Sequence, residues 1–331
     1  MTTTLYTNKE LSNERYHSEE FPQASGSVMA EIITTCPAEF IGKEREEKEV
    51  FTNGTTTHCA ILEPAQFKID YVRGIDPADY PDALDGNSSL EKWLEERGIK
   101  CKKKPKAELL ELIDMTGENP PILQRIIDSH AANAAENNMQ VVDPKLYDSI
   151  LKMRSALKKN GYIFSPDLMY EVSIVDDEFK VRIDIIVPPG AMAPDGTITK
   201  NGEIWDYKTC ASVHPEKFGT DAAKFKYWLK MALQADMFER HFGVQPDRVV
   251  LLAQGKKAPF LPVAYALDDQ QLNAGRGEYW EAKVILDECK STGNWIGYAP
   301  KGAVVPLFTP VWAAYQYGFD TESVELIEAE E

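Results

Sequence analysis

Two carboxylates and a lysine interrupt segments of the chain that are otherwise apolar and rich in β-branched residues. Asp206 and Lys208 lie in the segment 204–208, and Asp184 lies in the segment 179–188. Side chains alternate between the two sides of a strand, so Asp206 and Lys208 share a face, while the tryptophan and tyrosine beside them share the other. Burying a charge in a sheet is costly unless the charge is paired or holds a metal ion. The pattern therefore predicts a compact charged site on neighbouring strands.

Such a site suits the hydrolysis of phosphodiester bonds. Mg²⁺ takes oxygen ligands and keeps several waters, so one or two carboxylates and a substrate phosphate can hold it. The metal lowers the pKa of a bound water and neutralises phosphate charge. A neighbouring lysine can orient or deprotonate that water and offset negative charge in the transition state. The alternative is an exposed Asp206–Lys208 ion pair on an edge strand, which would carry no chemistry.

The same residues resemble a known signature. The segments Arg182-Ile-Asp184 and Glu203-Ile-Trp-Asp-Tyr-Lys-Thr209 resemble the D…(D/E)xK motif of the PD-(D/E)XK nuclease superfamily. The likeness extends to a helix containing Gln234, to the segment HFGVQPDRVVLLAQ at 241–254, and to Gly54-Thr-Thr-Thr-His-Cys-Ala-Ile-Leu-Glu-Pro64. This combination is similar to the nuclease domain of the RecE-type exonucleases (exonuclease VIII). It is much more specific than the D…DxK pattern alone.

The resemblance implies a role for each matching residue. Asp184 and Asp206 would ligate Mg²⁺, for which Mn²⁺ can substitute, and Lys208 would act on the attacking water. Glu171 matches an additional acidic residue that can hold a second metal ion, and His58 matches a histidine that approaches the metal. The resemblance thus implies one or two ions, with Asp184, Asp206, Glu171 and His58 as metal ligands.

A glutamine completes the implied catalytic set, with one departure from the family pattern. Gln234 matches the glutamine of a QxxxY motif, but the position four residues later is Phe238. A contact made by the tyrosine hydroxyl is lost, although the ring can still pack or stack on DNA. Plain structural alternatives remain for three residues: His58 as a capping or packed histidine, Glu171 as a solvent-facing strand residue, and Gln234 as a polar residue on a helix surface.

The resemblance also implies an activity and partners. It implies an exonuclease that digests double-stranded DNA in the 5′→3′ direction and leaves 3′ single-stranded overhangs. It further implies a ring-shaped homo-oligomer, a single-strand-annealing recombinase (RecT-like) as partner, and a phage or prophage setting in a bacterial cytoplasm. No P-loop is present, so ATP-driven activity is not expected. Two alternatives remain: a RecB-like nuclease of different polarity, and a non-catalytic DNA-binding or decoy protein on a nuclease fold.

The charge distribution bears on DNA binding. The net charge is −17, which argues against a broad basic footprint but not against local basic stretches. Two groups of lysines are candidate DNA contacts, with a solvated helix face or loop as the alternative: Lys224, Lys226 and Lys230 on an expected helix, and Lys102, Lys103 and Lys104 in the basic run 100–106.

The pattern of apolar residues predicts an α/β fold with a restriction-endonuclease-like core, in which helices flank a mixed sheet. We expect a mainly helical region at 1–160 that donates His58, a nuclease core at 161–310, and an acidic tail at 311–331 that is disordered or loosely docked. Within the first region, residues 88–118 form either an SAP-like helix–loop–helix insertion or a solvated helical hairpin. The expected core elements are strands at 168–176, 179–188, 203–209 and 248–254, and helices at 215–242 and 270–291.

The remaining composition narrows the class of protein. The five cysteines form no CxxC pair and are odd in number, which favours reduced thiols over a disulfide framework or a zinc site. The N-terminus lacks the pattern of a secretory signal, and no apolar run is long enough for a transmembrane helix. We therefore expect a cytoplasmic protein without structural zinc and without membrane partners.

Overall fold

The computed structural model describes residues 2–42 and 49–318, and its centre is a mixed β-sheet. The strands follow the order β1-β5-β6-β7-β8-β9, with β2 paired to β6. The β7–β8 and β2–β6 pairs are parallel, and the other pairs are antiparallel. The strands of this sheet are β1 (Thr4–Tyr6), β2 (Ala24–Ser25), β5 (Met169–Val175), β6 (Phe179–Val187), β7 (Glu203–Cys210), β8 (Arg248–Gly255) and β9 (Pro262–Ala266).

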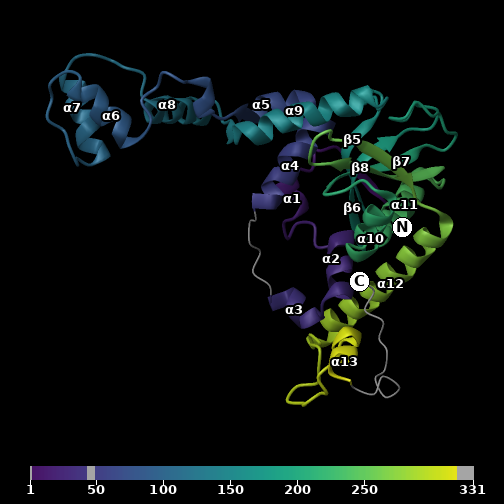
Figure 1. Ribbon diagram of the computed structural model, residues 1–331. Helices are drawn as coiled ribbons and strands as arrows, with labels where there is room; N and C mark the ends of the chain where they lie inside the picture. The colour runs from purple at the N-terminus through teal and green to yellow at the C-terminus, as the bar shows by residue number, and fades with distance from the viewer. Residues whose placement is uncertain (1, 43–48, 319–331) are drawn as a thin grey trace.

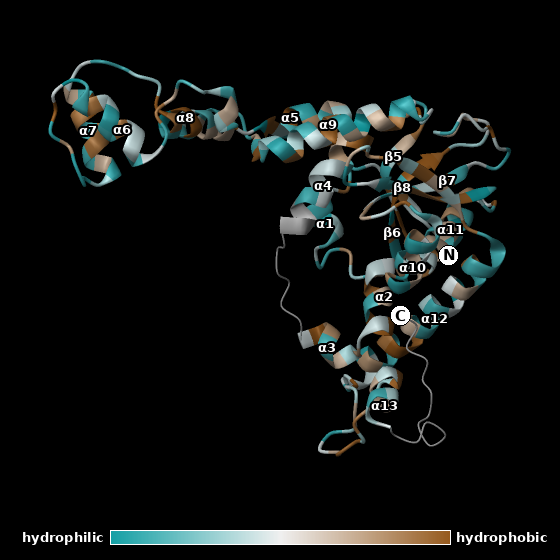
Figure 2. Cartoon of the chain, viewed as in Figure 1, coloured by the Kyte–Doolittle hydropathy of each residue, from teal (hydrophilic) through white to brown (hydrophobic). Residues whose placement is uncertain are grey.

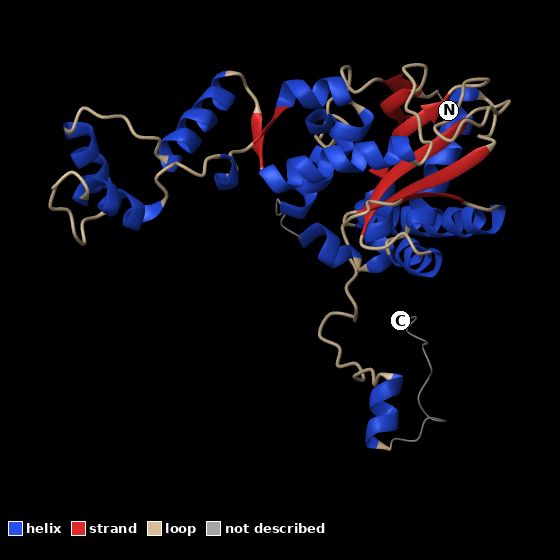
Figure 3. Cartoon of the chain, turned by 45° about the horizontal axis from the view of Figure 1, so that its top comes forward, coloured by secondary structure: helices blue, strands red, loops and turns tan. Residues whose placement is uncertain are grey.

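Helices cover both faces of the sheet (Figures 1 and 3). On one face, apolar side chains of α2, α11 and α12 form the main core with β5, β6, β7 and β8. On the other face, α4 and α9 pack through Ile61, Leu62 and Leu157 onto Trp205 and Tyr207. The helices of the core are α1 (Asn13–Tyr16), α2 (Gly26–Thr34), α3 (Pro37–Gly42), α4 (Glu49–Leu62), α9 (Pro144–Lys159), α10 (Pro215–Lys224), α11 (Tyr227–Phe242) and α12 (Asp269–Thr292).

The packing of α11 against α12 depends on one glycine. A Cβ atom at Gly275 would lie 2.3 Å from the carbonyl oxygen of Trp228, so no side chain fits there without moving a backbone. The close approach brings the backbones of α11 and α12 together, and hydrophilic and apolar residues alternate along the visible side of α12 (Figure 2). Helix α11 is in consequence buried along most of its length, which fixes the position of Gln234.

An arm projects from the side of the molecule that carries α4 (Figure 1). Its base is the parallel pair β3–β4, and its tip is the α6–α7 unit, which has an apolar core of its own. The elements of the arm are α5 (Pro64–Asp70), β3 (Tyr71–Arg73), the 3₁₀ helix η1 (Pro77–Asp79), α6 (Gly86–Glu95), α7 (Lys106–Met115), α8 (Leu123–Glu136) and β4 (Gln140–Val142).

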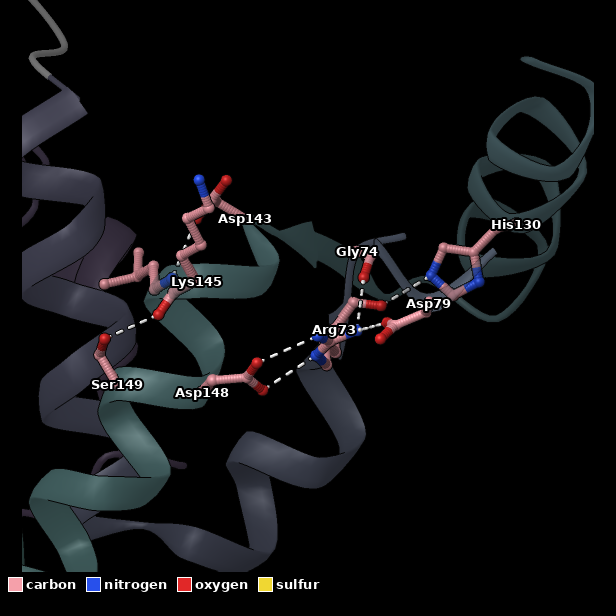
Figure 4. A network of polar contacts seen from close by, with 9 residues as sticks. Arg73, Gly74, Asp79, His130, Asp143, Lys145, Asp148 and Ser149 are labelled. Carbon is pink, nitrogen blue, oxygen red and sulfur yellow. Dashed lines mark hydrogen bonds and ion pairs between the residues drawn. The ribbon is translucent and has the colours of Figure 1, made fainter. Parts of the chain in front are cut away.

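Arg73 connects the base of the arm to helix α9 through hydrogen bonds (Figure 4). Its guanidinium donates two hydrogen bonds to Asp148 on α9, at 2.9 and 3.0 Å, and one to Asp79, at 2.6 Å. The imidazole Nε2 of His130 on α8 lies 2.9 Å from the carbonyl oxygen of Arg73. A single residue thus connects β3 with α9, η1 and α8.

The mixed sheet flanked by helices confirms the predicted fold class, but several local expectations were wrong. The helix expected at 215–242 is two helices, because Lys226 adopts a left-handed conformation with a φ of 56°. The short strand β4 interrupts the region expected to be mainly helical at 1–160. Residues 53–62, which contain His58, belong to the helix α4. Short strands such as β9 give too little alternation to be recognised from sequence.

The C-terminal region begins with a helix. Helix α13 (Val311–Tyr317) lies apart from the sheet at the end of a long loop (Figure 3). The part of the predicted tail at 311–317 is therefore ordered, while its six acidic residues lie outside the described residues. Among the described helices, none is long and apolar enough to cross a membrane.

Candidate active site

The site forms where two neighbouring strands separate. Strands β6 and β7 pair from Val187 to Ile185, which lies opposite Trp205, and the pairing stops there. Asp184 follows in the opening and accepts a hydrogen bond of 2.8 Å from the backbone N–H of Tyr207. Its carboxylate thereby takes the place of a backbone carbonyl as the acceptor for this N–H, where pairing between β6 and β7 has ended. This position brings Asp184 next to Asp206, as the sequence pattern predicted.

A second distortion lies between β5 and β6. The residues on either side of Glu171 pair with those on either side of Asp184, but no pairing joins these two residues. Glu171 has a φ of 51°, a conformation that side chains other than glycine rarely adopt and that tends to persist at functional sites. The apolar side chains change face here: Ile183 packs on one side of the sheet and Ile185 on the other. The alternate apolar residues of 179–187 therefore do not share one face, although the regular alternation of a strand would have predicted that they do.

Helix α4 brings a histidine to the two carboxylates. The Nδ1 atom of His58 lies 3.6 Å from the Oδ2 atom of Asp184, and its ring packs edge-on against Tyr207 with centroids 5.2 Å apart. Burial, together with the charge of Lys208, lowers the pKa of His58 to about 4, so the imidazole is neutral and can donate a lone pair. One ligand atom each from His58, Glu171 and Asp184 lie within 4.8 Å of one another. This donor set fits a divalent cation that accepts oxygen and nitrogen ligands.

Lys208 forms an ion pair with Asp206 on the central strand β7. Because Asp206 is 5% exposed and β7 has neighbours on both sides, the interpretation as an ion pair on an edge strand was wrong. Burial alone would lower the pKa of Lys208, but Asp206 and Asp184 outweigh it and the pKa is raised. The side chain is therefore an ammonium group that donates hydrogen bonds. In this arrangement it can orient a water molecule or neutralise a phosphate oxygen.

The carboxylates of Asp184, Asp206 and Glu171 concentrate negative charge in a region that is largely buried from solvent. Burial, reinforced by Asp206, raises the pKa of Asp184 well above its usual range. Burial also raises the pKa of Glu171 to about 7, although Arg182 acts in the opposite direction. Buried carboxylates side by side resist ionisation unless a cation balances them. The electrostatics of the site therefore favour the binding of a positive ion.

A cavity of about 250 Å³ opens beside Asp184, Asp206 and Lys208. The N-terminal segment forms one wall of it, and sequence reasoning missed this contribution. The ammonium of Lys180 donates hydrogen bonds of 2.6 Å to the carbonyl oxygens of Tyr16 and Phe21, and Arg182 donates one of 2.6 Å to the carbonyl of Leu11. Wall residues that the sequence analysis did not single out include Asn13, Tyr16, His17, Ser25 and Ser27.

Gln234 lines the same cavity from helix α11. It is 7% exposed, and its Nε2 donates a 3.3 Å hydrogen bond to the carbonyl of Arg182. Its Oε1 atom is buried and has no hydrogen-bond partner in the described part of the chain. The interpretation of Gln234 as a helix-surface residue was therefore wrong. Phe238 is fully buried in the main core, with its ring 4.5 Å from that of Phe242, so it packs there and is not placed to stack on DNA.

The candidate DNA-contacting lysines fall in different places. Lys230 lines the cavity, and burial together with the charge of Lys208 lowers its pKa. Lys226 forms a 2.6 Å ion pair with Glu278, and neither it nor the exposed Lys224 lines the cavity. Lys102, Lys103 and Lys104 lie between α6 and α7 at the tip of the arm, away from the sheet (Figure 1).

A mixed sheet that presents Asp184, Asp206 and Lys208 on adjoining strands, with flanking helices, is the core of a PD-(D/E)XK nuclease fold. A family model described as a PDDEXK-like domain of unknown function (DUF3799) matches residues 27–304, and the chain belongs to this family. Membership supports a nuclease. Nucleases of this kind generally use divalent metals, and the group of His58, Glu171 and Asp184 could hold one.

Two further comparisons add little. A crystal structure of a candidate exonuclease from Eubacterium rectale is similar to this chain, with 13% identity and a TM-score of 0.46. The likeness covers 92% of this chain and 97% of that one, at a level too low for an inference about activity. No curated protein matches the chain.

Proposed function

We propose that the protein hydrolyses phosphodiester bonds of double-stranded DNA with Mg²⁺, or with Mn²⁺ in its place, and without ATP. One observation carries this proposal: Asp184 lies close to His58 and Glu171 and also close to the Asp206–Lys208 pair. Metal ligands and an ammonium donor thus adjoin a cavity that also holds Lys230 and Gln234. No single one of these features would identify the chemistry, but together they supply the metal ligands and the ammonium donor that metal-assisted phosphodiester hydrolysis can use.

Each residue has a distinct part in the proposed reaction. Asp184, Glu171, His58 and Asp206 would hold the metal, which activates a bound water and neutralises the scissile phosphate. Lys208, held as an ammonium by Asp206, orients the attacking water and balances the charge that develops on the phosphate oxygens. The buried Oε1 atom of Gln234, which has no partner among the described residues, can accept a hydrogen bond from that water or from a hydroxyl at a DNA strand end.

The finer assignment is a 5′→3′ exonuclease that leaves 3′ single-stranded overhangs. Its support is the likeness of residues 54–64, 182–184, 203–209 and 241–254 to RecE-type exonucleases. The same likeness supports a ring-shaped homo-oligomer, a single-strand-annealing recombinase as partner, and a role in phage-type homologous recombination in the bacterial cytoplasm.

The test uses linear duplex DNA labelled separately at its 5′ and 3′ ends, beside a covalently closed circle. We expect early release of the 5′ label in Mg²⁺, no release in EDTA, and an intact circle. Asp206→Asn should abolish release, whereas Asp287→Asn, which removes an exposed carboxylate on α12, should not. Circular dichroism and thermal unfolding would verify that both variants are folded.

Other outcomes would change the assignment. Early release of the 3′ label would favour a RecB-like nuclease of different polarity, and a cut circle would indicate an endonuclease. DNA binding without cleavage in Mg²⁺ or Mn²⁺ would indicate a non-catalytic DNA-binding protein. Full activity of Asp206→Asn would refute the proposed site.

A further inference from the structure

The tip of the arm is a separate small unit, here called the distal unit (residues 84–122). Its core consists of the buried side chains Leu90, Leu94, Cys101, Leu109, Ile113 and Ile122. Leu84 closes the unit by bridging to Ile122 and by accepting and donating backbone hydrogen bonds at 3.1 and 2.8 Å. No residue of this core belongs to the clusters that hold the central sheet. The distal unit therefore adds little to the packing around the catalytic cavity. A contribution to that packing does not explain which residues lie on its surface.

The loop between α6 and α7, here called the lysine loop (residues 100–106), concentrates positive charge on this unit. It holds five lysines in seven residues of a chain whose net charge is −17. Lys100, Lys102 and Lys103 are exposed. Lys102 lies 3.9 Å from Glu95, and Lys104 forms a 2.8 Å pair with Glu108. Among the described residues, no carboxylate forms an ion pair with Lys100 or Lys103, so these two charges face the solvent.

The backbone holds the lysine loop in a defined shape. Lys103 has a φ of 60°, and its N–H donates a 3.0 Å hydrogen bond to the carboxylate of Glu91 on α6. The loop then runs directly into α7, whose first turn follows Pro105 and receives no side-chain cap. Uncapped N–H groups at a helix start bear a partial positive charge and can bind anions. The loop thus places its exposed lysines beside the uncapped N–H groups of α7, whose first turn also carries Glu108, the partner of Lys104.

We propose that the lysine loop and the first turn of α7 bind the phosphate backbone of duplex DNA at a point remote from the catalytic cavity. This inference rests on the proposed function for its substrate. Lysines are point charges suited to phosphates, and the loop carries no arginine, asparagine or glutamine that would read bases. The contact is therefore independent of sequence. Because the rest of the chain is acidic, a local cationic contact would offset long-range repulsion of DNA.

The base of the arm makes such a contact useful to a nuclease. The β3–β4 pair and the hydrogen bonds of Arg73 hold the arm to α9 (Figure 4), and β3 follows α4 and α5 directly along the chain. The lysine loop is thus joined through the base of the arm to the elements that carry His58. A second contact on one duplex raises the effective concentration of DNA at the catalytic cavity and slows its dissociation.

The experiment measures binding without cleavage. Full-length protein would be titrated against a fluorescent blunt duplex in EDTA at several salt concentrations, with anisotropy as the readout. The test variant carries Lys100→Gln, Lys102→Gln and Lys103→Gln. A matched control carries Lys158→Gln, Lys159→Gln and Lys290→Gln, which are exposed lysines on α9 and α12. Thermal unfolding would verify that both proteins are folded.

Loss of phosphate contacts has a quantitative signature. Each contact contributes about 0.9 to the slope of log K against log salt, so the test variant should lower that slope by roughly 2 to 3 and weaken binding at low salt by at least about tenfold. The control should bind like the wild type. Cleavage of a duplex too short to span the arm and the cavity should be unchanged in the test variant.

The outcomes separate this inference from the proposed function. Weaker binding by the test variant supports the inference even if no cleavage is ever seen. Equal slopes for the test and control variants overturn it even if the protein is an active exonuclease, and the lysine loop would then serve another anionic partner. Failure of the wild type to bind duplex DNA at all also overturns it.

Discussion

Replacing Glu171 with glutamine tests whether the negative charge of the buried carboxylates is left unneutralised until a cation binds. Glutamine preserves the shape of the side chain and removes its charge. Burial raises the pKa of Glu171 from 4.5 to about 7, so ionisation is less favourable in the folded protein than in the unfolded chain. At about 1.4 kcal/mol per pKa unit, ionised Glu171 lowers the free energy of unfolding by at most about 3.5 kcal/mol.

The sign of the effect defines the pH window. The folded protein binds this proton more tightly, so the stabilising contribution of neutral Glu171 is complete below pH 4.5 and is lost as the pH rises through about 7. In EDTA at pH 8, Glu171→Gln should be more stable than the wild type by about 1 to 3 kcal/mol, or roughly 2 to 6 °C in Tm. The difference should shrink toward pH 5.

The assay is thermal and urea unfolding in EDTA at pH 5 and pH 8, repeated with Mg²⁺. Mg²⁺ should stabilise the wild type more than Glu171→Gln, because the variant has lost a candidate ligand. Glu281→Gln, on the exposed side of α12, is the matched control and should show neither effect. A variant that is less stable than the wild type at pH 8 in EDTA, or a difference that does not depend on pH, would refute the reasoning.

Three further substitutions test separate parts of the structure. Lys208→Met should lower single-turnover cleavage by about 10² or more while Mg²⁺ still raises Tm, because the ammonium acts on the reacting groups and is not itself a metal ligand. Gln234→Leu should change Tm little, because removing a buried oxygen that has no partner among the described residues offsets the loss of the 3.3 Å hydrogen bond to the carbonyl of Arg182, yet it should slow cleavage in the same assay. Arg73→Leu should speed hydrogen exchange in β3 and β4 but change Tm little, because Asp79 and Asp148 are half exposed and such pairs contribute about 1 kcal/mol or less.

Local periodicity was enough to predict the chemically important face of β7. The two-residue repeat of a strand places Asp206 and Lys208 on one side, and the structure has them on the cavity side while Trp205 and Tyr207 pack on α4 and α9. This prediction needed no knowledge of distant residues. His58 was identified as a site residue only from the family resemblance, because nothing in the local pattern of 54–64 shows that α4 contacts Asp184.

Long-range contacts explain what the sequence did not reveal. The wall formed by Tyr16 depends on hydrogen bonds to Lys180, 164 residues away along the chain. The change of face at Glu171 and Asp184 depends on where β6 and β7 separate, which is decided by packing on both sides of the sheet. The break at Lys226 follows no glycine or proline, so no turn signal marks it.

Several features that cost stability meet at this one site, and this supports a function independently of any resemblance. Glu171 has an unfavourable φ, burial disfavours the ionisation of Asp184 and Glu171, and Gln234 holds a buried oxygen that has no partner among the described residues. Each of these costs stability, and packing alone would be better satisfied by apolar residues. A divalent cation would neutralise the carboxylates, and a hydrated phosphodiester would supply a donor for Gln234. The same ligands would relieve the charge imbalance and the missing hydrogen bond together, so the region is best explained as a site completed by metal and substrate.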